Sequence, residues 1–289
     1  MGLDIHSAQF LWNQKRRGVH FGRMLTLGRQ AVYMPRLLYQ SHLKALGVDP
    51  MQSDYADDFF RGLGATSIDF MDASNYEGAN IVQDLNQPIP KQLAESYDSV
   101  FDGGALEHIF NFPTGLKNCM EMVRPGGHLI IITTWNNYAG HGFYQFSPEL
   151  FYSALSAENG YAVEQMLVVQ RNRWYSVANP SEVGTRIELI NCEPTLLFLN
   201  AKRLASKPVF STWPQQSDYS ALWSPGKSLR QQPPSALGLK PALLKKSAAL
   251  RSLQQRWQVR KHRKFCSVSN RQSFRPVDVE DFFTPARKW

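Results

Sequence analysis

The sequence predicts an α/β fold in which helices cover both faces of a mostly parallel sheet. Residues 97–134 carry the pattern of a strand, a loop, a helix, a turn and a second strand. The second strand contains the uninterrupted apolar run Leu129–Ile132, which is typical of a strand that is buried on both faces. A connection of this length joins two parallel strands in a right-handed crossover. These observations together indicate the α/β class.

Each part of this unit has a local reason. Tyr97–Asp102 alternates as a short strand, and the pair Gly103-Gly104 ends it and opens a loop. Apolar side chains then recur at helical spacing, which predicts a helix up to Val123. The triplet Pro125-Gly126-Gly127 stops that helix, because proline cannot continue it and glycine accepts the turn.

The other elements follow from the same patterns. A helix is expected over 7–17 and another over 31–46, with Pro35 in its first turns, and Ser147 caps a helix that ends at Asn159-Gly160. Residues 48–64 form an insertion, where Asp54, Asp57 and Asp58 predict a solvated helix with an acidic first turn. The predicted strands outside the central unit are 23–28, 65–74, 79–84, 161–171 and 195–203.

Composition limits the class of protein. A chain of 289 residues suits one large domain or a domain with an extension. Cys119, Cys192 and Cys266 are far apart, so they indicate neither a disulfide framework nor a zinc site, and no metal site is expected. The sequence shows no apolar run of membrane-spanning length and no secretory signal pattern. The expected location is therefore the cytoplasm.

The charge is unevenly distributed along the chain. Residues 201–289 hold 18 Lys and Arg against 4 Asp and Glu, whereas residues 1–200 hold 14 against 20. A slightly acidic body thus carries a strongly basic C-terminal extension. Such asymmetry predicts an acidic partner for the extension.

The stretch YDSVFDGGALEHIF, followed by MVRPGGHLIII, resembles the fourth and fifth strands of Rossmann-like S-adenosylmethionine-dependent methyltransferases. The resemblance covers roughly residues 23–203. It implies a seven-stranded, mostly parallel sheet in a domain at 1–204, with 205–289 as the basic extension. It also implies S-adenosyl-L-methionine as the cofactor.

The resemblance assigns six residues to cofactor binding: Gly28, Asp72, Asp84, Leu85, Asp102 and Gly103. Asp72 in Asp72-Ala73-Ser74 would accept hydrogen bonds from the ribose hydroxyls, and Asp69 competes with it for this role. The first loop departs from the pattern of the family. Thr26 replaces an acidic residue there, and Gln30 and Val32 stand at glycine positions.

Two histidines are candidates for catalysis. His108 follows Glu107 in the loop after the fourth strand, and His141 lies between two glycines in an aromatic segment after the fifth. Glu107 and His108 could do acid–base work, and His141 could be a general base for an acceptor hydroxyl. Either histidine could instead hold its loop by packing or hydrogen bonds.

The extension begins with a Pro-, Ser- and Gln-rich linker over 206–241. Residues 242–265 then predict a basic amphipathic helix. It can lie on an anionic membrane surface, bind an acidic partner, or pack on the body with its Leu and Trp side chains. The sequence shows no specific nucleic-acid signal.

The predicted function is methyl transfer to an oxygen or nitrogen of a small molecule or saccharide. The alternative is a catalytically silent relative that binds or scaffolds a partner, which the incomplete glycine loop favours. The sequence does not identify the acceptor, the oligomeric state or the partner of the extension.

Overall fold

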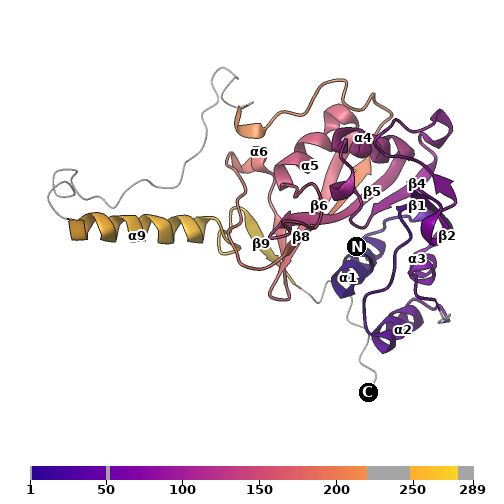
Figure 1. Ribbon diagram of the computed structural model, residues 1–289, viewed down its shortest axis with the longest axis horizontal. Helices are drawn as coiled ribbons and strands as arrows, with labels where there is room; N and C mark the ends of the chain where they lie inside the picture. Colours follow the sequence, from indigo (N-terminus) through magenta and orange to yellow (C-terminus); the bar gives the residue numbers. More distant parts are fainter. Residues whose placement is uncertain (1, 50–52, 220–247, 279–289) are drawn as a thin grey trace.

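The computed structural model describes residues 2–49, 53–219 and 248–278, and these residues form a nine-stranded mixed sheet (Figure 1). The strand order is β3-β2-β1-β4-β5-β8-β6-β7-β9. Along this order, neighbouring strands are parallel from β3 through β2, β1 and β4 to β5. They are antiparallel from β5 through β8, β6 and β7 to β9. The strands are β1 (Gly22–Leu27), β2 (Ala65–Asp72), β3 (Ile81–Val82), β4 (Tyr97–Asp102), β5 (Val123–Asn136), β6 (Tyr161–Gln170), β7 (Arg173–Val177), β8 (Thr195–Arg203) and β9 (Phe274–Val277).

The α/β class and all seven predicted strands are confirmed, but the predicted strand number was too low. Strand β7 pairs with β6 across Arg171 and Asn172, whose φ angles are 51° and 56°. This left-handed two-residue turn contains no glycine, so the sequence carried no hairpin signal. Strand β9 was missed because it lies in the segment assigned to the extension.

Helices cover both faces of the sheet. On one face, α4 (Phe112–Met122) and α5 (Pro148–Ala154) bury Leu116 and Phe151 against β4, β5 and β8. On the other face, α1 (Ile5–Arg16) and α3 (Asp57–Leu63) contribute to a second apolar cluster. The remaining helices are α2 (Arg36–Ala45), α6 (Pro180–Val183) and α9 (Ala248–Phe265), with short 3-10 turns η1 (Tyr76–Gly78), η2 (Lys91–Leu93), η3 (Leu106–His108) and η4 (Ala157–Asn159).

The predicted start of the helix after β1 was wrong. The helix predicted from Ala31 begins at Arg36, because Ala31 and Val32 form β-bridges to Tyr55 and Leu3. The loop after β1 therefore does not run directly into a helix N-terminus.

The helix predicted to be solvated is instead packed into the protein. In α3, Phe59 and Phe60 are fully buried. The acidic first turn is present, but Asp57 pairs with Arg29 and Asp58 with Arg61. Carboxylates that are paired with arginines can be buried at a helix N-terminus. The positions of acidic residues in the sequence do not reveal such pairs.

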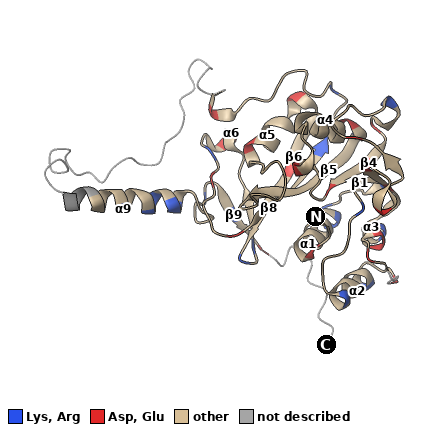
Figure 2. Ribbon diagram, in the orientation of Figure 1, with Lys and Arg blue, Asp and Glu red and all other residues tan. Residues whose placement is uncertain are grey.

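The basic helix α9 projects from the body near the β9 end of the sheet (Figure 1). Its charged side chains are Lys and Arg (Figure 2), and Leu253 and Val259 are exposed. The described part of α9 thus does not pack these apolar residues on the body. Residues 242–247 of the predicted helix and 220–241 of the predicted linker lie outside the described residues.

Residues beyond 204 also contribute to the core. Val209 is buried in the α4–α5 cluster, and Phe274 of β9 is fully buried there, with its ring stacked on Trp135 at a centroid distance of 6.0 Å. The division of the chain at residue 204 stays a prediction. These contacts join residues after 204 to the core of the predicted domain. Within the described residues, no helix combines the length and apolar character needed to cross a bilayer.

Candidate functional site

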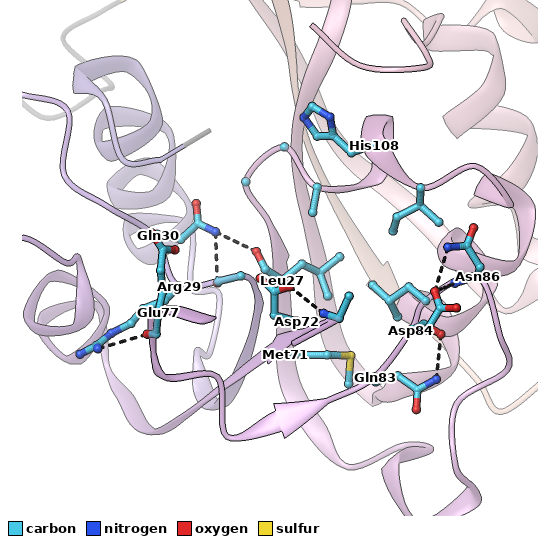
Figure 3. A pocket seen from close by; sticks show the side chains of 17 residues that line it. Leu27, Arg29, Gln30, Met71, Asp72, Glu77, Gln83, Asp84, Asn86 and His108 are labelled. Carbon is cyan, nitrogen blue, oxygen red and sulfur yellow. Dashed lines mark hydrogen bonds between the residues drawn. The ribbon is translucent and has the colours of Figure 1, made fainter. Parts of the chain in front are cut away.

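A cavity of about 380 Å³ opens at the carboxyl ends of β1 to β4 (Figure 3). The strand order turns back between β1 and β4, which are adjacent at the centre of the parallel part of the sheet. Open α/β sheets bind ligands at such switch points, outside the carboxyl ends of the strands. The position and size of the cavity are therefore those of a ligand site.

The turn after β1 brings backbone close to the tip of β2. Gly28 has φ +67°, and its N–H donates to the Met71 carbonyl at 2.7 Å. A Cβ on Gly28 would be strained by this angle and would lie 3.7 Å from Asp72 Oδ2. The buried Thr26 hydroxyl donates to the Gly28 carbonyl at 2.8 Å. Thr26 thus stabilises the turn with a hydrogen bond and contributes no charge to the cavity.

Gln30 spans two of the loops that form the cavity wall. Its Nε2 donates to the carbonyls of Leu27 at 2.9 Å and Gly28 at 3.3 Å, as Figure 3 shows. Its Oε1 faces Gly103 in the loop after β4 so closely that a Cβ on Gly103 would lie 2.3 Å away. In the sequence, Gln30 stands out only as a missing glycine, because the burial of its side chain depends on β4.

Asp72 ends β2 and lines the cavity, whereas Asp69 does not. Asp72 Oδ1 accepts a hydrogen bond from the Ala73 N–H at 2.6 Å. Asp69 instead binds Arg23, Asn80 and the Tyr97 hydroxyl. Burial alone would raise the pKa of Asp69, but these three hydrogen bonds outweigh it and lower the pKa. Asp69 is therefore committed to the sheet, and Asp72 is the carboxylate that faces the cavity.

The loop after β3 contributes Asp84 and Leu85 to the cavity wall. Asp84 is exposed, and the backbone and side-chain N–H groups of Asn86 lower its pKa. Asn86 in turn accepts from the Asn111 N–H at 2.8 Å. Leu85 is buried and gives this side of the cavity an apolar surface. Asn86 was missed because its role depends on contact with Asn111.

The loop after β4 places Gly103 in the cavity wall but Asp102 behind it. Asp102 is fully buried and is absent from the lining residues. Its Oδ1 accepts from the N–H groups of Gly104 at 3.1 Å and Ala105 at 2.7 Å. Burial and the neighbouring Glu107 raise its pKa to about 7. Asp102 therefore shapes the Gly103-Gly104 loop and does not present its carboxylate to the cavity.

His108 and His141 lie together beside the cavity. His108 lines it, and the two imidazole rings are 5.1 Å apart between centroids. His141 Nε2 is 3.8 Å from Oε1 of Glu107, which is fully buried. Burial lowers the pKa of His108, with His141 adding to the effect and Glu107 opposing it. The structure thus brings both predicted histidines to one place and adds Glu107 to them.

Arg29 and Glu77 complete the charged lining, and the sequence analysis missed both. Arg29 pairs with Asp57 at 2.6 Å and stacks over the Tyr55 ring at 4.1 Å. The hydrogen bonds that Arg29 donates to Asp57 raise the pKa of Arg29. With Arg29 already paired, the carboxylates of Asp72, Glu77 and Asp84 leave the wall with an excess of negative charge.

The fold and this cavity define an α/β protein with a ligand site at the switch point of its sheet. No protein family and no curated protein match the sequence. Solved structures do resemble the chain, and those that follow are methyltransferases. The 1,6-didemethyltoxoflavin-N1-methyltransferase of Burkholderia thailandensis, with 1,6-didemethyltoxoflavin and S-adenosylhomocysteine bound, has 13% identity over 68% of this chain and 77% of its own, with a TM-score of 0.42.

N-methyltransferase NodS of Bradyrhizobium japonicum, in complex with S-adenosylhomocysteine, has 11% identity over 68% of this chain and 84% of its own, with a TM-score of 0.39. An S-adenosylmethionine-dependent methyltransferase of Mesorhizobium loti has 14% identity over 67% and 98%, with a TM-score of 0.35. At this level of likeness, the function of the chain has to be inferred from its own residues.

Proposed function

We propose that this protein is an S-adenosylmethionine-dependent methyltransferase. The observation that carries the proposal is that one cavity collects five of the six residues predicted to bind the cofactor, from the ends of four strands. These residues are Gly28, Asp72, Asp84, Leu85 and Gly103.

The residues of the cavity fit the chemical groups of this cofactor. Asp72 keeps acceptor capacity for the two ribose hydroxyls, because the only described hydrogen bond of its carboxylate engages Oδ1. Leu85 offers an apolar surface for the adenine ring, and Gly28 lets the backbone approach. The excess of carboxylates favours a ligand that carries positive charge. When bound, S-adenosylmethionine supplies an electrophilic methyl group on a sulfonium.

The residues of the chain then have to position the acceptor and receive its proton. Most of the rate enhancement in such a transfer comes from holding the acceptor in line with the methyl group. His108 borders the cavity, and either imidazole is a base of suitable strength for an oxygen or nitrogen acceptor. The exposed rings of Phe110 and Phe143, 5.7 Å apart, offer a stacking surface next to the histidines. We infer a small-molecule or saccharide acceptor.

One observation favours the alternative of a silent binding protein. The Gln30 side chain joins the loops after β1 and β4 directly, at the place where a ligand would be held between them. If Gln30 keeps this position, the cavity is shortened on that side. A chain selected only to bind a partner would tolerate such a closure.

Calorimetric titration with S-adenosylmethionine and S-adenosylhomocysteine tests the proposal. The parent protein should bind both. Asp72→Asn keeps the shape of the side chain and should weaken binding by about 1.5–3 kcal/mol, the range for a hydrogen bond to a charged group. Asp49→Asn removes an exposed carboxylate outside the cavity and should leave binding unchanged. Absence of binding at millimolar cofactor would overturn the proposal and favour the silent protein.

A further inference from the structure

Glu107 is a buried carboxylate with an unused oxygen. Its side chain is fully buried, and Oε2 accepts from the Thr133 hydroxyl at 2.9 Å. Oε1 has no hydrogen-bond partner among the described residues, and His141 Nε2 lies 3.8 Å from it. A buried charge in this situation is costly unless a cation or proton compensates it.

The shortage of positive charge extends to Asp102. This second carboxylate is also fully buried, and within the part of the chain that the structure describes its Oδ2 lacks a hydrogen-bond partner. Among the described residues, neither Lys nor Arg forms an ion pair with Asp102 or Glu107. An added cation would therefore compensate buried negative charge that no described Lys or Arg neutralises.

Two imidazoles complete a set of donor atoms around Glu107. One ligand atom from each of Glu107, His108 and His141 lies within 4.8 Å of the others. The loops that carry them are fixed to each other, because the Glu107 carbonyl accepts from the N–H groups of Phe143 at 2.8 Å and Tyr144 at 3.2 Å. The arrangement thus depends on backbone contacts and not on a chance meeting of side chains.

We propose that Glu107, His108 and His141 bind a divalent transition-metal cation. Two imidazole nitrogens and one carboxylate oxygen suit Zn²⁺, Mn²⁺ or Fe²⁺ better than Mg²⁺ or Ca²⁺, which prefer oxygen ligands. Ligand distances of about 2.0–2.2 Å place donor atoms roughly 3 Å apart, so side-chain rotations of modest size would close the site. His141, whose side chain is 33% exposed, has room for this movement.

Three protein ligands leave coordination positions open, as in catalytic metal sites. Because His108 is part of the cavity wall, the cation would border the cavity. This step rests on the proposed function: an acceptor hydroxyl would occupy an open position, and the cation would lower the pKa of the hydroxyl. Because the imidazoles would serve as ligands here, the hydroxyl proton would leave to solvent and not to a histidine. The oxygen lone pair would form the new bond to the methyl carbon while the carbon–sulfur bond of the sulfonium breaks, and its electron pair would stay on sulfur in the departing thioether. The proposal thus selects oxygen acceptors over nitrogen acceptors.

A second group of possible ligands has to be kept apart in any test. Glu188, His262 and Cys266 lie near one another where α9 meets the body. Here the Cys266 thiol already donates to Glu188 Oε2 at 3.2 Å, and the carboxylate and imidazole are exposed. This group lacks the unused buried oxygen of Glu107. His262→Asn removes one of its ligands at an exposed position of α9.

The experiment titrates Co²⁺, and then Zn²⁺ in competition, into the full chain carrying His262→Asn after treatment with chelator. Visible absorption of Co²⁺ and calorimetry report the affinity and the number of sites, without any cofactor present. The expected result is one site per chain. Glu107→Gln and His141→Asn should each weaken it at least 30-fold. His20→Asn, which changes a histidine whose side chain is 69% exposed, should leave the affinity unchanged.

Failure to bind Co²⁺ or Zn²⁺ at millimolar concentration would overturn the proposal, as would an affinity that survives His141→Asn. If Glu107→Gln does not fold, His141→Asn still decides the outcome because its side chain is partly exposed. Cofactor binding is measured separately in the metal-free protein. The metal site and the methyltransferase function can therefore fail independently of each other.

Discussion

Gln30 in the loop after β1 lies directly against Gly103 in the loop after β4, so that a Cβ on Gly103 would fall 2.3 Å from Gln30 Oε1. The two residues come from adjacent strands, and together they close one end of the cavity. A side chain at position 103 would therefore displace the end of the Gln30 side chain, whose Nε2 is held by two hydrogen bonds.

This relationship predicts a coupling between the two positions. Gly103→Ala should destabilise the protein by about 1–3 kcal/mol, because the added methyl group overpacks the contact. Gln30→Gly should remove most of that cost in the double variant, with a coupling energy of at least about 0.5 kcal/mol. Urea unfolding of the four proteins measures the cycle. If the two changes have strictly additive effects on the free energy of unfolding, the methyl group added at position 103 does not contact Gln30.

Gly28 should be required for ligand binding and not only for folding. Gly28→Val places a branched side chain at φ +67° beside Asp72 and should abolish cofactor binding, with a loss of stability of about 1–3 kcal/mol. Gly47→Val is the matched control, since Gly47 has φ +74° and open space around it. It should cost similar stability but leave calorimetric binding intact. Equal binding by the two variants would rule out the predicted role of Gly28.

His128 should make stability depend on pH. Burial lowers its pKa in the folded state, while Asn200 and Glu164 partly oppose this effect and Lys202 adds to it. The folded protein then binds a proton more weakly than the unfolded chain, so stability is present above the ordinary pKa of 6.5 and is lost as pH falls below it. Between pH 7.5 and 5.5, the free energy of unfolding of the parent should therefore fall relative to that of His128→Gln in urea titrations. The raised pKa of Asp102 acts in the opposite direction, but it is common to both proteins and cancels in this difference. A difference that does not change with pH would contradict this assignment.

Phe274 should anchor β9 in the core. Phe274→Ala removes a fully buried ring and should lower the free energy of unfolding by about 3–5 kcal/mol. Leu253→Ala on α9 changes a side chain that is 58% exposed and should change stability by less than about 0.5 kcal/mol. Thermal and urea unfolding distinguish the two.

A chain ending at Lys207 should also be less stable than the full protein, and equal stability would support a separable extension.

The strands of the central sheet could be predicted because each has a strong local pattern. The apolar run Leu129–Ile132 has few structural alternatives, and Gly103-Gly104 marks its loop regardless of context. Asp72 could be chosen over Asp69 because it lies closer to the end of the predicted strand, and the end of a strand can be located from the sequence alone. Strand β9 has no such pattern: Phe274–Val277 contains a proline and is recognisable only from its pairing with β7.

The chemistry of the site was less predictable because it depends on burial. In the sequence, Asp102 ends a strand and Glu107 follows in the loop, and neither position reveals that the carboxylate is fully buried. The segment that carries His141 approaches Glu107 through backbone hydrogen bonds between residues more than 30 positions apart. Such contacts leave no trace in residue spacing. The sequence therefore indicated Glu107 and the two histidines as separate candidates but not that they meet at one place.

The pairing of β9 with β7 has a consequence for a chain that is cut. The residues before and after 220–247 are each held on the body, by Val209 on one side and by Phe274 and the β7–β9 ladder on the other. A single cleavage within 220–247 would produce two fragments, and the shorter one would remain bound without a covalent link. The nicked protein would then melt at a temperature that rises with its concentration, as expected for a two-chain complex.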